Sequence, residues 1–328
     1  MTSVTVQAPA KINLSLGVGP PRDDGYHSLA TVYHAVSLFD RVQASPAPAG
    51  EFSVEVAAYA GDDAGDDPGD HADSAGSRGP SLAGVPAGDD NLAVRAARLL
   101  ADRTGVDAGA HLRLGKSIPV AGGLAGGSTD AAAALVACNV LWGTDLPPED
   151  LQQLAARIGS DVPFCLVGGT ATGSGRGEEV SPALVQGSYH WVLAVAEDGL
   201  STPSVYAEID RLRAGSAVPE PSVPDALMNA LRAGDAKALG PALTNDLEPA
   251  AVLLRPELGE LLRLGEACGA LGGMVSGSGP TCAFLANDEA HALDICMGLA
   301  SAGACQSVHR VTGPVPGAQV TSARVVDA

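Results

Sequence analysis

A glycine-rich segment between an expected strand and an alanine-rich expected helix is the feature that most constrains this chain. The segment reads GGLAGGS at residues 122–128, and the helix is expected over 129–142, ended by Gly143. Glycines let the backbone adopt positive φ and approach a ligand closely. The following helix presents unpaired N–H groups and the positive end of its dipole, an arrangement suited to anions. The order strand, loop and helix therefore predicts a phosphate site. A tight packing loop is the alternative for an isolated glycine cluster.

The candidate phosphate-binding segment includes the residues on either side of these glycines, and two hydroxyls stand in the first turn of the helix. Its members are Pro119, Val120, Ala121, Gly122, Gly123, Leu124, Ala125, Gly126, Gly127, Ser128 and Thr129. The chain holds a near match to the Walker A pattern, Gly109 with Gly115-Lys116-Ser117, but five residues separate the glycines where that pattern has four. The GxGxxG dinucleotide signature is also absent from 122–127. Another phosphate-binding fold is therefore expected.

The charge of the chain is strongly negative but unevenly distributed. There are 38 acidic and 19 basic residues, a formal net charge of −19. Residues 45–90 carry ten acids and one base, whereas residues 1–44 are neutral and residues 91–130 carry five bases and three acids. A generally basic surface is absent, so no nucleic-acid partner is expected. The segments with the phosphate loop and Lys11 are nevertheless compatible with anionic substrates.

Most of the acidic block is an expected insertion at about 60–88. It consists almost entirely of Gly, Asp, Ala, Pro and Ser. Such a segment has too little apolar surface to offset the entropy lost on ordering, so we expect it to be disordered. Its aspartates do not have the spacing of a calcium-binding loop, which disfavours a metal site there.

The chain has no segment typical of membrane or secreted proteins. No apolar run approaches the ~18 residues of a membrane span, and the N-terminus lacks a basic region before an apolar one. Six cysteines are scattered among apolar neighbours with no C-x-x-C motif, which favours buried free thiols. We expect a cytoplasmic protein without a membrane partner.

The pattern of apolar residues predicts mixed helices and strands in two domains. The first, 1–183, has expected strands at 3–8, 31–44, 51–59 and 110–117, and helices at 91–104, 129–142 and 149–158, the first capped by Asp89 or Asp90. The second, 184–328, has expected strands at 191–196, 283–285, 307–312 and 319–325, and helices at 204–213, 223–232, 257–268 and 288–302.

Two charged residues among apolar neighbours are candidates for catalysis. Lys11 lies in APAKIN, and Asp161 lies in IGSDVPF after Gly159 ends a helix. A surface lysine and a simple helix cap are the alternatives. Together they predict a pair in which Lys11 keeps Asp161 ionised beside a substrate hydroxyl. A second glycine loop, at 276–280, is either a structural turn or a segment that closes over the first loop.

Three segments resemble the GHMP superfamily of small-molecule kinases. They are PAKINLSLGVGPPRDDGYHSL (9–29), PVAGGLAGGSTDAA (119–132) and SGSGPTCAF (276–284). Their order and spacing are specific, and the resemblance covers the chain except for 60–88. It implies an α+β fold of two domains with the active site between them. The N-terminal domain would resemble the second domain of ribosomal protein S5, and the C-terminal domain would be ferredoxin-like.

The Lys-Ile-Asn start and Asp24-Gly-Tyr-His27 are similar to the members that act in non-mevalonate isoprenoid synthesis. This similarity implies transfer of the ATP γ-phosphoryl group, with Mg²⁺, to the 2-hydroxyl of cytidyl-diphospho-methylerythritol. Lys11 and Asp161 match the superfamily's catalytic lysine and aspartate, with Asp161 as general base. The alternatives are a homoserine-type or mevalonate-type kinase, which the Tyr-His pair disfavours, and a non-catalytic nucleotide-sensing relative, which the retained catalytic pair disfavours.

The resemblance also implies residues that bind the substrates. Tyr26, His27 and Tyr206 match a cytosine site, and Asn13 and Thr202 lie toward the methylerythritol unit. Further nucleotide-site candidates are Lys116, placed in the adenine pocket by position only, and Ser276, Gly277, Ser278 and Gly279. The Mg²⁺ ligands stay open, with Ser128 and Asp130 as candidates, and so does the choice between monomer and homodimer.

The loop departs from the family pattern at Ala121, Ala125, Thr129 and Asp130. Ala125 costs little at negative φ but is strained at positive φ.

Overall fold

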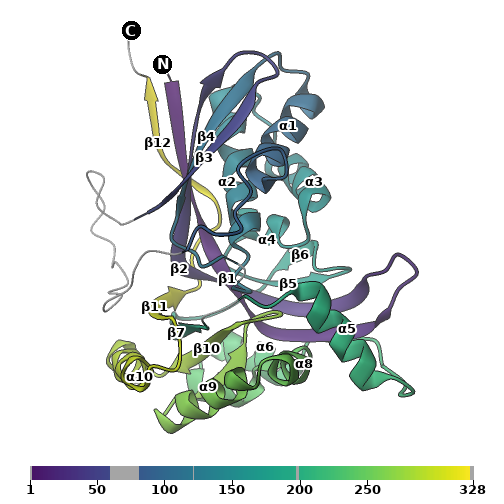
Figure 1. Ribbon diagram of the computed structural model, residues 1–328, viewed down its shortest axis with the longest axis vertical. Coiled ribbons are helices and arrows are strands. Elements are labelled where there is room, and N and C mark those ends of the chain that lie inside the picture. The colour runs from purple at the N-terminus through teal and green to yellow at the C-terminus, as the bar shows by residue number, and fades with distance from the viewer. Residues whose placement is uncertain (1, 60–80, 121, 197–198, 326–328) are drawn as a thin grey trace.

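The computed structural model describes residues 2–59, 81–120, 122–196 and 199–325, and in these residues the chain forms two lobes (Figure 1). Ala121 and residues 60–80 of the expected insertion lie outside the described residues. The α+β fold of two domains is confirmed. None of the helices in the described ranges combines the length and apolar character of a membrane span.

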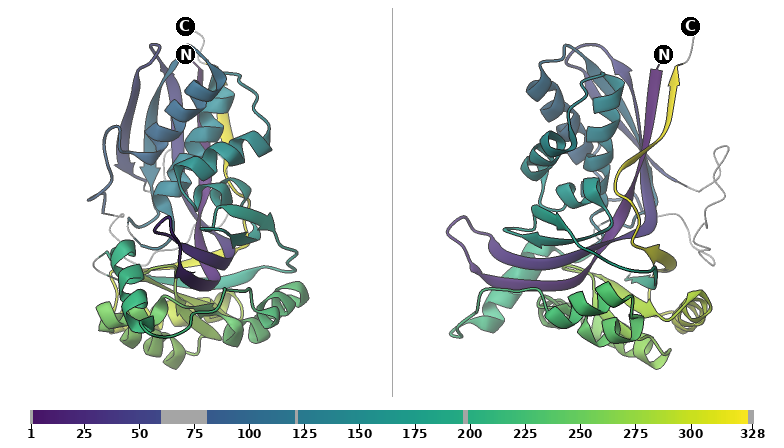
Figure 2. Two further views of the ribbon diagram at one scale, coloured as in Figure 1. Left: turned by 90° about the vertical axis from the view of Figure 1, so that its right-hand side faces the viewer. Right: turned by 180° about the vertical axis from the view of Figure 1, so that it is seen from behind.

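The upper lobe is built on an eight-stranded sheet within the described ranges. The strand order is β12-β1-β2-β4-β3, with β5 paired to β2, β6 to β5 and β8 to β1. The strands are β1 (Thr2–Pro21), β2 (His27–Ala47), β3 (Phe52–Ala58), β4 (Gly109–Lys116), β5 (Thr170–Ser174), β6 (Glu179–Pro182), β8 (Thr244–Asn245) and β12 (Gln319–Val325). β1 and β2 are much longer than the sequence predicts. They pair antiparallel along most of their length and extend beyond the upper lobe as a hairpin (Figure 2).

Four helices cover one face of this sheet: α1 (Leu92–Thr104), α2 (Gly126–Leu141), α3 (Pro148–Ile158) and α4 (Val162–Val167). α2 lies between the sheet and its neighbouring helices, in contact with β1, β2, α1 and α4. Its alanines at 131–134 and 137 are fully buried. Small side chains on all sides let this helix pack closely against both layers. The alanine-rich composition therefore reflects burial on more than one face.

The lower lobe has a four-stranded antiparallel sheet in the order β11-β7-β10-β9. The strands are β7 (Tyr189–Val195), β9 (Gly272–Val275), β10 (Thr281–Ala286) and β11 (Ser307–Gly313). The helices are α5 (Thr202–Arg213), α6 (Asp225–Ala233), α7 (Ala236–Leu239), α8 (Glu248–Leu254), α9 (Pro256–Ala267) and α10 (Glu289–Ala302), with the 3₁₀ turn η1 (Gly240–Ala242). Every cysteine is a free thiol, four of them buried and Cys268 and Cys305 half-buried.

Two details differ from the sequence prediction. The N-cap of α1 is Asn91, whose side chain accepts the N–H of Ala93 at 2.9 Å, whereas Asp89 and Asp90 are exposed. Asp89 is instead paired with Arg98 on the surface. The boundary near 183 stays a prediction, but the chain does not divide there in simple order, because β12 returns to the first sheet and pairs with β1.

We predict that Gly265→Ala destabilises the lower lobe. A Cβ at Gly265 on α9 would lie 2.1 Å from the buried ring of Phe284 on β10. Overpacking of this kind costs about 1–3 kcal/mol of unfolding free energy, to be measured by urea denaturation. Glu260→Ala, at an exposed position of the same helix, should change stability by no more than about 0.5 kcal/mol. Equal stability of the two variants would contradict the close packing of α9 on the sheet.

Candidate active site

The first glycine loop ends at the beginning of α2, three residues earlier than expected. Gly126, Gly127 and Ser128 form its first turn, and the first helical hydrogen bond runs from the N–H of Thr129 to the Ala125 carbonyl at 2.9 Å. The three preceding N–H groups therefore lack partners within the helix. In the described residues, no side chain caps this end of α2. The arrangement can bind the oxygens of a phosphate chain.

Among the described residues of the loop, positive φ angles fall on one glycine and one alanine. Gly123 has φ +73°, and Ala125 has φ 63° and ψ 28° as the N-cap of α2. A left-handed conformation costs a residue with a Cβ roughly 1–2 kcal/mol. The sequence left open whether Ala125 is strained, and the structure shows that it is.

The second glycine loop packs directly on the first, which is one of the two possibilities that the sequence leaves open. Residues 276–280 connect β9 to β10, and the Ser276 hydroxyl donates to the Gly123 carbonyl at 3.2 Å. A Cβ on Gly123 would lie 2.3 Å from the carbonyl oxygen of Ser276. Only glycine fits at Gly123 without moving one loop. The two lobes therefore meet at the candidate phosphate site.

Lys11 lies on β1 between these two loops. Its N–H donates to the Leu124 carbonyl at 3.2 Å, so the strand is bonded to the phosphate loop. Its ammonium donates to Asn13 Oδ1 at 2.7 Å and lies 3.6 Å from Asp161 Oδ2. A Cβ placed on Gly277 would be 3.4 Å from the same Nζ. The expected Lys11–Asp161 pair is thus formed at the meeting point of the lobes.

Asp161 stands at the start of α4, but the described residues show no capping hydrogen bond from its side chain. Its Oδ1 instead accepts the hydroxyl of Tyr33 on β2 at 3.1 Å. Burial, and then the charge of Asp161, raises the pKa of Tyr33 well above its ordinary value, so that Tyr33 remains a donor. Asp161 retains 27% of its side-chain exposure, compared with 6% for Lys11. The carboxylate is therefore bonded to Tyr33, lies beside Lys11 and is still partly exposed to solvent.

A second group of expected residues gathers where the hairpin of β1 and β2 crosses α5. The rings of His27 and Tyr206 lie 5.1 Å apart, and His27 Nε2 lies 2.8 Å from Asp210 Oδ1. Burial and the charge of Asp161 raise the pKa of Tyr206. Tyr26 is 54% exposed, with the Arg176 guanidinium 4.9 Å from its ring. These contacts form a half-open aromatic group of side chains.

Other expected residues join the two sides of the site. The Thr202 and Ser278 hydroxyls lie 2.8 Å apart, which connects α5 to the second loop. Asn13 is buried, and its amide donates to Thr31 Oγ1 at 2.8 Å. Asn13 therefore fixes the Lys11 ammonium, and its own amide group is directed into the protein.

Three of the expected site residues, Thr129, Asp130 and Lys116, have buried side chains. The Thr129 hydroxyl is fully buried and donates to the Pro9 carbonyl at 2.9 Å, so it does not face a phosphate. Asp130 is buried, and its Oδ2 accepts from the Lys116 ammonium at 2.6 Å. The Asp130 carboxylate is thus bonded to Lys116 inside the protein and does not face the open end of the loop. Lys116 is itself only 2% exposed and does not line an open adenine pocket.

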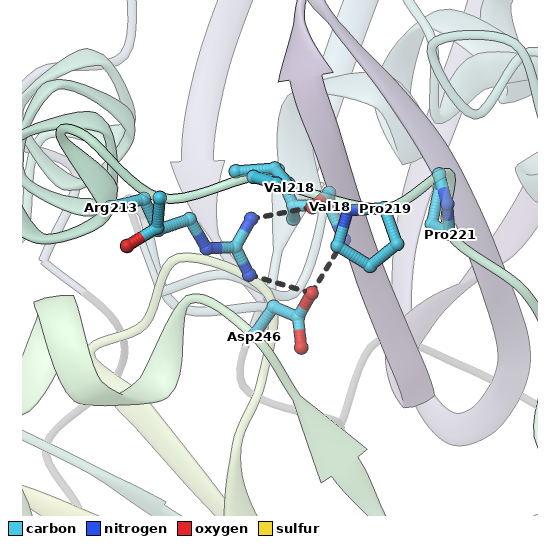
Figure 3. Close-up of a pocket in the computed structure, with 8 residues that line it drawn as sticks. Val18, Arg213, Val218, Pro219, Pro221 and Asp246 are labelled. Atoms are coloured by element: carbon cyan, nitrogen blue, oxygen red, sulfur yellow. Dashed lines mark hydrogen bonds and ion pairs between the residues drawn. The ribbon is translucent and has the colours of Figure 1, made fainter.

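A salt bridge holds the hairpin against the lower lobe (Figure 3). Arg213, at the end of α5, donates to the Val18 carbonyl at 2.5 Å and to Asp246 Oδ2 at 2.9 Å. The same carboxylate oxygen accepts the Val18 N–H at 2.9 Å. These groups border a cavity of about 280 Å³ together with residues 216–219 and Pro221. Because their polar atoms bond to one another, the contact is an anchor for β1.

Sequence reasoning missed the residues that hold the site residues in place. Tyr33 lies in a β-rich run and resembles an ordinary core aromatic, and its partner is 128 positions away. Asp210 lies four residues after Tyr206 on α5, a helical spacing that places both on one face. That spacing was the one available signal. No pattern in the sequence indicates that Asp246 and Arg213 are partners.

Comparison with known proteins defines the class first. Residues 91–169 match the GHMP kinases N terminal domain, and residues 227–304 match the GHMP kinases C terminal domain. A homoserine kinase from Cytophaga hutchinsonii superposes with a TM-score of 0.69 at 19% identity over 97% of each chain. The L. major mevalonate kinase superposes with a TM-score of 0.68 at 16% identity, over 94% of this chain and 95% of that one. The chain has the fold of the GHMP kinases, which are ATP-dependent small-molecule kinases.

Closer relatives narrow the class. The 4-diphosphocytidyl-2-C-methyl-D-erythritol kinase of Thermobifida fusca is 54% identical over 97% of this chain and 98% of its own length. That of Mycobacterium tuberculosis is 49% identical over 98% of this chain and 94% of its own. A crystal structure of such a kinase superposes with a TM-score of 0.71 at 31% identity, covering 94% of this chain and 99% of that one. This chain belongs to the family of 4-diphosphocytidyl-2-C-methyl-D-erythritol kinases.

The anchor at Arg213 predicts a selective binding defect. Arg213→Met should loosen the hairpin that carries His27 and raise the KM for the phosphoryl acceptor about tenfold, with the KM for ATP little changed. Steady-state kinetics with each substrate varied in turn provides the measurement. Arg211→Met, which removes an exposed surface pair with Glu208 on the same helix, is the matched control and should behave as wild type. An unchanged acceptor KM in Arg213→Met would show that the anchor does not position the site.

Proposed function

We propose that this chain transfers the γ-phosphoryl group of ATP to the 2-hydroxyl of 4-diphosphocytidyl-2-C-methyl-D-erythritol, in non-mevalonate isoprenoid synthesis. The observation that carries the proposal is the Lys11–Asp161 pair. It lies between a phosphate-binding loop on one side and the aromatic site of His27 and Tyr206 on the other. An acceptor hydroxyl beside Asp161 would face a phosphate held by α2.

Asp161 is the proposed general base. As the bond between the γ-phosphorus and the ADP oxygen breaks and the bond to the acceptor oxygen forms, the hydroxyl proton passes to the partly exposed Asp161 carboxylate, and ADP leaves. Phosphoryl transfer depends mainly on positioning and on stabilisation of the charge on the transferred group, so a weak base is sufficient. Tyr33 and Lys11 orient the carboxylate at 3.1 and 3.6 Å. The Lys11 ammonium also offsets negative charge between the two loops.

The phosphate chain is expected to lie against the first turn of α2. The N–H groups of Gly126, Gly127 and Ser128 are the donors, and the helix dipole adds a favourable field. Gly123 and the second loop close the other side. Ala121 belongs to the predicted phosphate segment, but it lies outside the described residues.

Mg²⁺ is the expected companion of ATP. Among the residues that the structure describes, no group of three or more His, Cys, Asp or Glu side chains is placed to hold a metal ion. That arrangement fits Mg²⁺, which is commonly held by substrate phosphates and water with one or two protein ligands. When bound, the ion neutralises charge on the phosphates. The half-buried Ser128 at the start of α2 is the remaining protein candidate.

The aromatic site is proposed to bind the cytosine. His27 and Tyr206 give a ring pair, Asp210 fixes the imidazole, and exposed Tyr26 offers a face for stacking. A homoserine or mevalonate acceptor has no base to stack there. Solved structures of those kinases share the fold at under 20% identity, whereas the cytidyl relatives reach 54%. The nucleobase-containing acceptor is therefore favoured.

An acceptor panel tests the function. The purified protein is given ATP and Mg²⁺ with 4-diphosphocytidyl-2-C-methyl-D-erythritol, homoserine or mevalonate, and ADP release is followed. We expect turnover with the cytidyl compound alone. Turnover with one of the other two, and none with the cytidyl compound, would replace the proposed acceptor.

Asp161→Asn tests the proposed base. The amide retains the shape of the side chain but accepts no proton, so kcat should fall by about 10²–10⁴-fold, measured by ADP release at saturating substrates. ATP affinity, measured by calorimetry, should remain within about threefold, because the N–H groups of α2 are untouched. Asp102→Asn, an exposed change on α1, is the control. A wild-type kcat in Asp161→Asn would remove Asp161 from the mechanism.

Tyr26→Ala tests the stacking role. Loss of the aromatic face should raise the KM for the cytidyl acceptor by about 5–150-fold, corresponding to the 1–3 kcal/mol of base stacking on an aromatic side chain, while kcat changes little. Tyr26→Phe retains the ring and should keep the wild-type KM. A defect confined to kcat, or equal defects in the two variants, would argue against stacking.

A further inference from the structure

A buried cluster of three charged residues lies directly beneath the phosphate loop. The Lys116 ammonium, at the end of β4, contacts Asp40 Oδ2 on β2, Asp130 Oδ2 on α2 at 2.6 Å and the Gly126 carbonyl at 3.3 Å. The three side chains are at most 4% exposed. The proposed phosphoryl transfer makes no use of them.

The cluster connects three elements at one point. The other oxygen of Asp40 accepts the N–H groups of Ser117 and Ile118 at 2.7 and 2.9 Å, which fixes the chain as it leaves β4 toward the glycine loop. Lys116 then joins that point to Asp130, in the second turn of α2, and to Gly126 in its first turn. Both ends of the glycine loop are therefore tied to the same ammonium.

The energetics of the cluster make this tie rigid. Charges removed from water are stable only with well-placed partners, and removing one partner of a buried pair is strongly destabilising. Burial alone would lower the pKa of Lys116, but the charges of Asp130 and Asp40 outweigh it and raise that pKa. The ammonium thus remains charged, and its position is fixed by two carboxylates and a carbonyl.

We propose that Lys116 is a positioning residue for ATP, which acts through Asp130 and Gly126 to hold the first turn of α2 in the orientation that binds phosphate. Its ammonium cannot reach a ligand, because it is buried and points into the cluster. It also balances the Asp130 carboxyl, which would otherwise place an unpaired negative charge next to the phosphate site. This inference rests on the proposed function.

The test is a double-mutant cycle on ATP affinity, measured by calorimetry with Mg²⁺ and ATP and no acceptor. Lys116→Met should weaken ATP binding about tenfold or more. In the Asp130→Asn background, the same substitution should cost much less, because the residue through which Lys116 acts has already changed. Equal losses in both backgrounds would mean that Lys116 acts on ATP independently of Asp130, which overturns the proposal.

A second variant and a second kinetic constant distinguish the proposed positioning role from a folding defect. If Lys116→Met does not fold, Asp130→Ala removes the tie but retains the lysine, and it should also weaken ATP binding about tenfold. Unchanged affinity in folded Asp130→Ala would refute the proposal. In these variants the KM for the cytidyl acceptor should stay within about twofold of the wild-type value. A general loss of structure would instead raise both the dissociation constant for ATP and the KM for the acceptor. Wild-type protein that fails to bind ATP would instead refute the proposed kinase function.

Discussion

The site depends on the contact between the two glycine loops. Gly123 and Ser276 come from different lobes, and the space between them is too small for a Cβ. Lys11 lies in the same place, with its backbone bonded to Leu124 and its ammonium beside Gly277. Because the loops meet there, the proposed phosphate-binding end of α2, the lysine and the Asp161 carboxylate lie close together. A shift of either lobe would separate them.

Electrostatics around this contact are organised locally, although the chain carries a net charge of −19. Lys11 faces Asp161 at the proposed reacting centre, and Lys116 is paired with Asp130 beneath the first glycine loop. Arg213 holds the acceptor hairpin through Asp246. Asp161, Asp130 and Asp246 thus each have a basic partner. A strongly acidic protein can bind anionic substrates when its site is arranged in this way.

The sequence predicted the parts of the site that local patterns define. Glycine spacing located both loops, and charged residues in apolar surroundings located Lys11 and Asp161. The partners Tyr33 and Asp40 could not be found in this way, because each looks like part of an ordinary strand until distant segments fold against it. The direction of the Thr129 hydroxyl, which bonds to the Pro9 carbonyl, could not be predicted for a related reason. A hydroxyl at a helix start can face a ligand or the core, and the rotation of α2 decides which.

The helices and strands likewise differ in how far local sequence patterns predict them. Long periodic helices such as α1 and α9 were predicted within a few residues. Short elements such as β5, β8 and α4 were missed, because their lengths are too small for a pattern to emerge. The return of β12 to pair with β1 is also invisible locally. Such pairings depend on contacts between segments that are distant in the sequence.

The most direct test of the contact between the two loops compares kcat/KM for ATP in Gly123→Ala and Gly143→Ala. Both glycines have positive φ, +73° and +59°, but a Cβ meets the second loop at Gly123 and nothing within 4 Å at Gly143. The two alanine variants therefore carry similar backbone strain, and they differ in whether the new Cβ meets the second loop. We predict a loss of about 100-fold in Gly123→Ala, the scale of a 1 Å misplacement, with near-wild-type kcat/KM in Gly143→Ala. Equal kcat/KM in the two variants would contradict the central role of the loop contact.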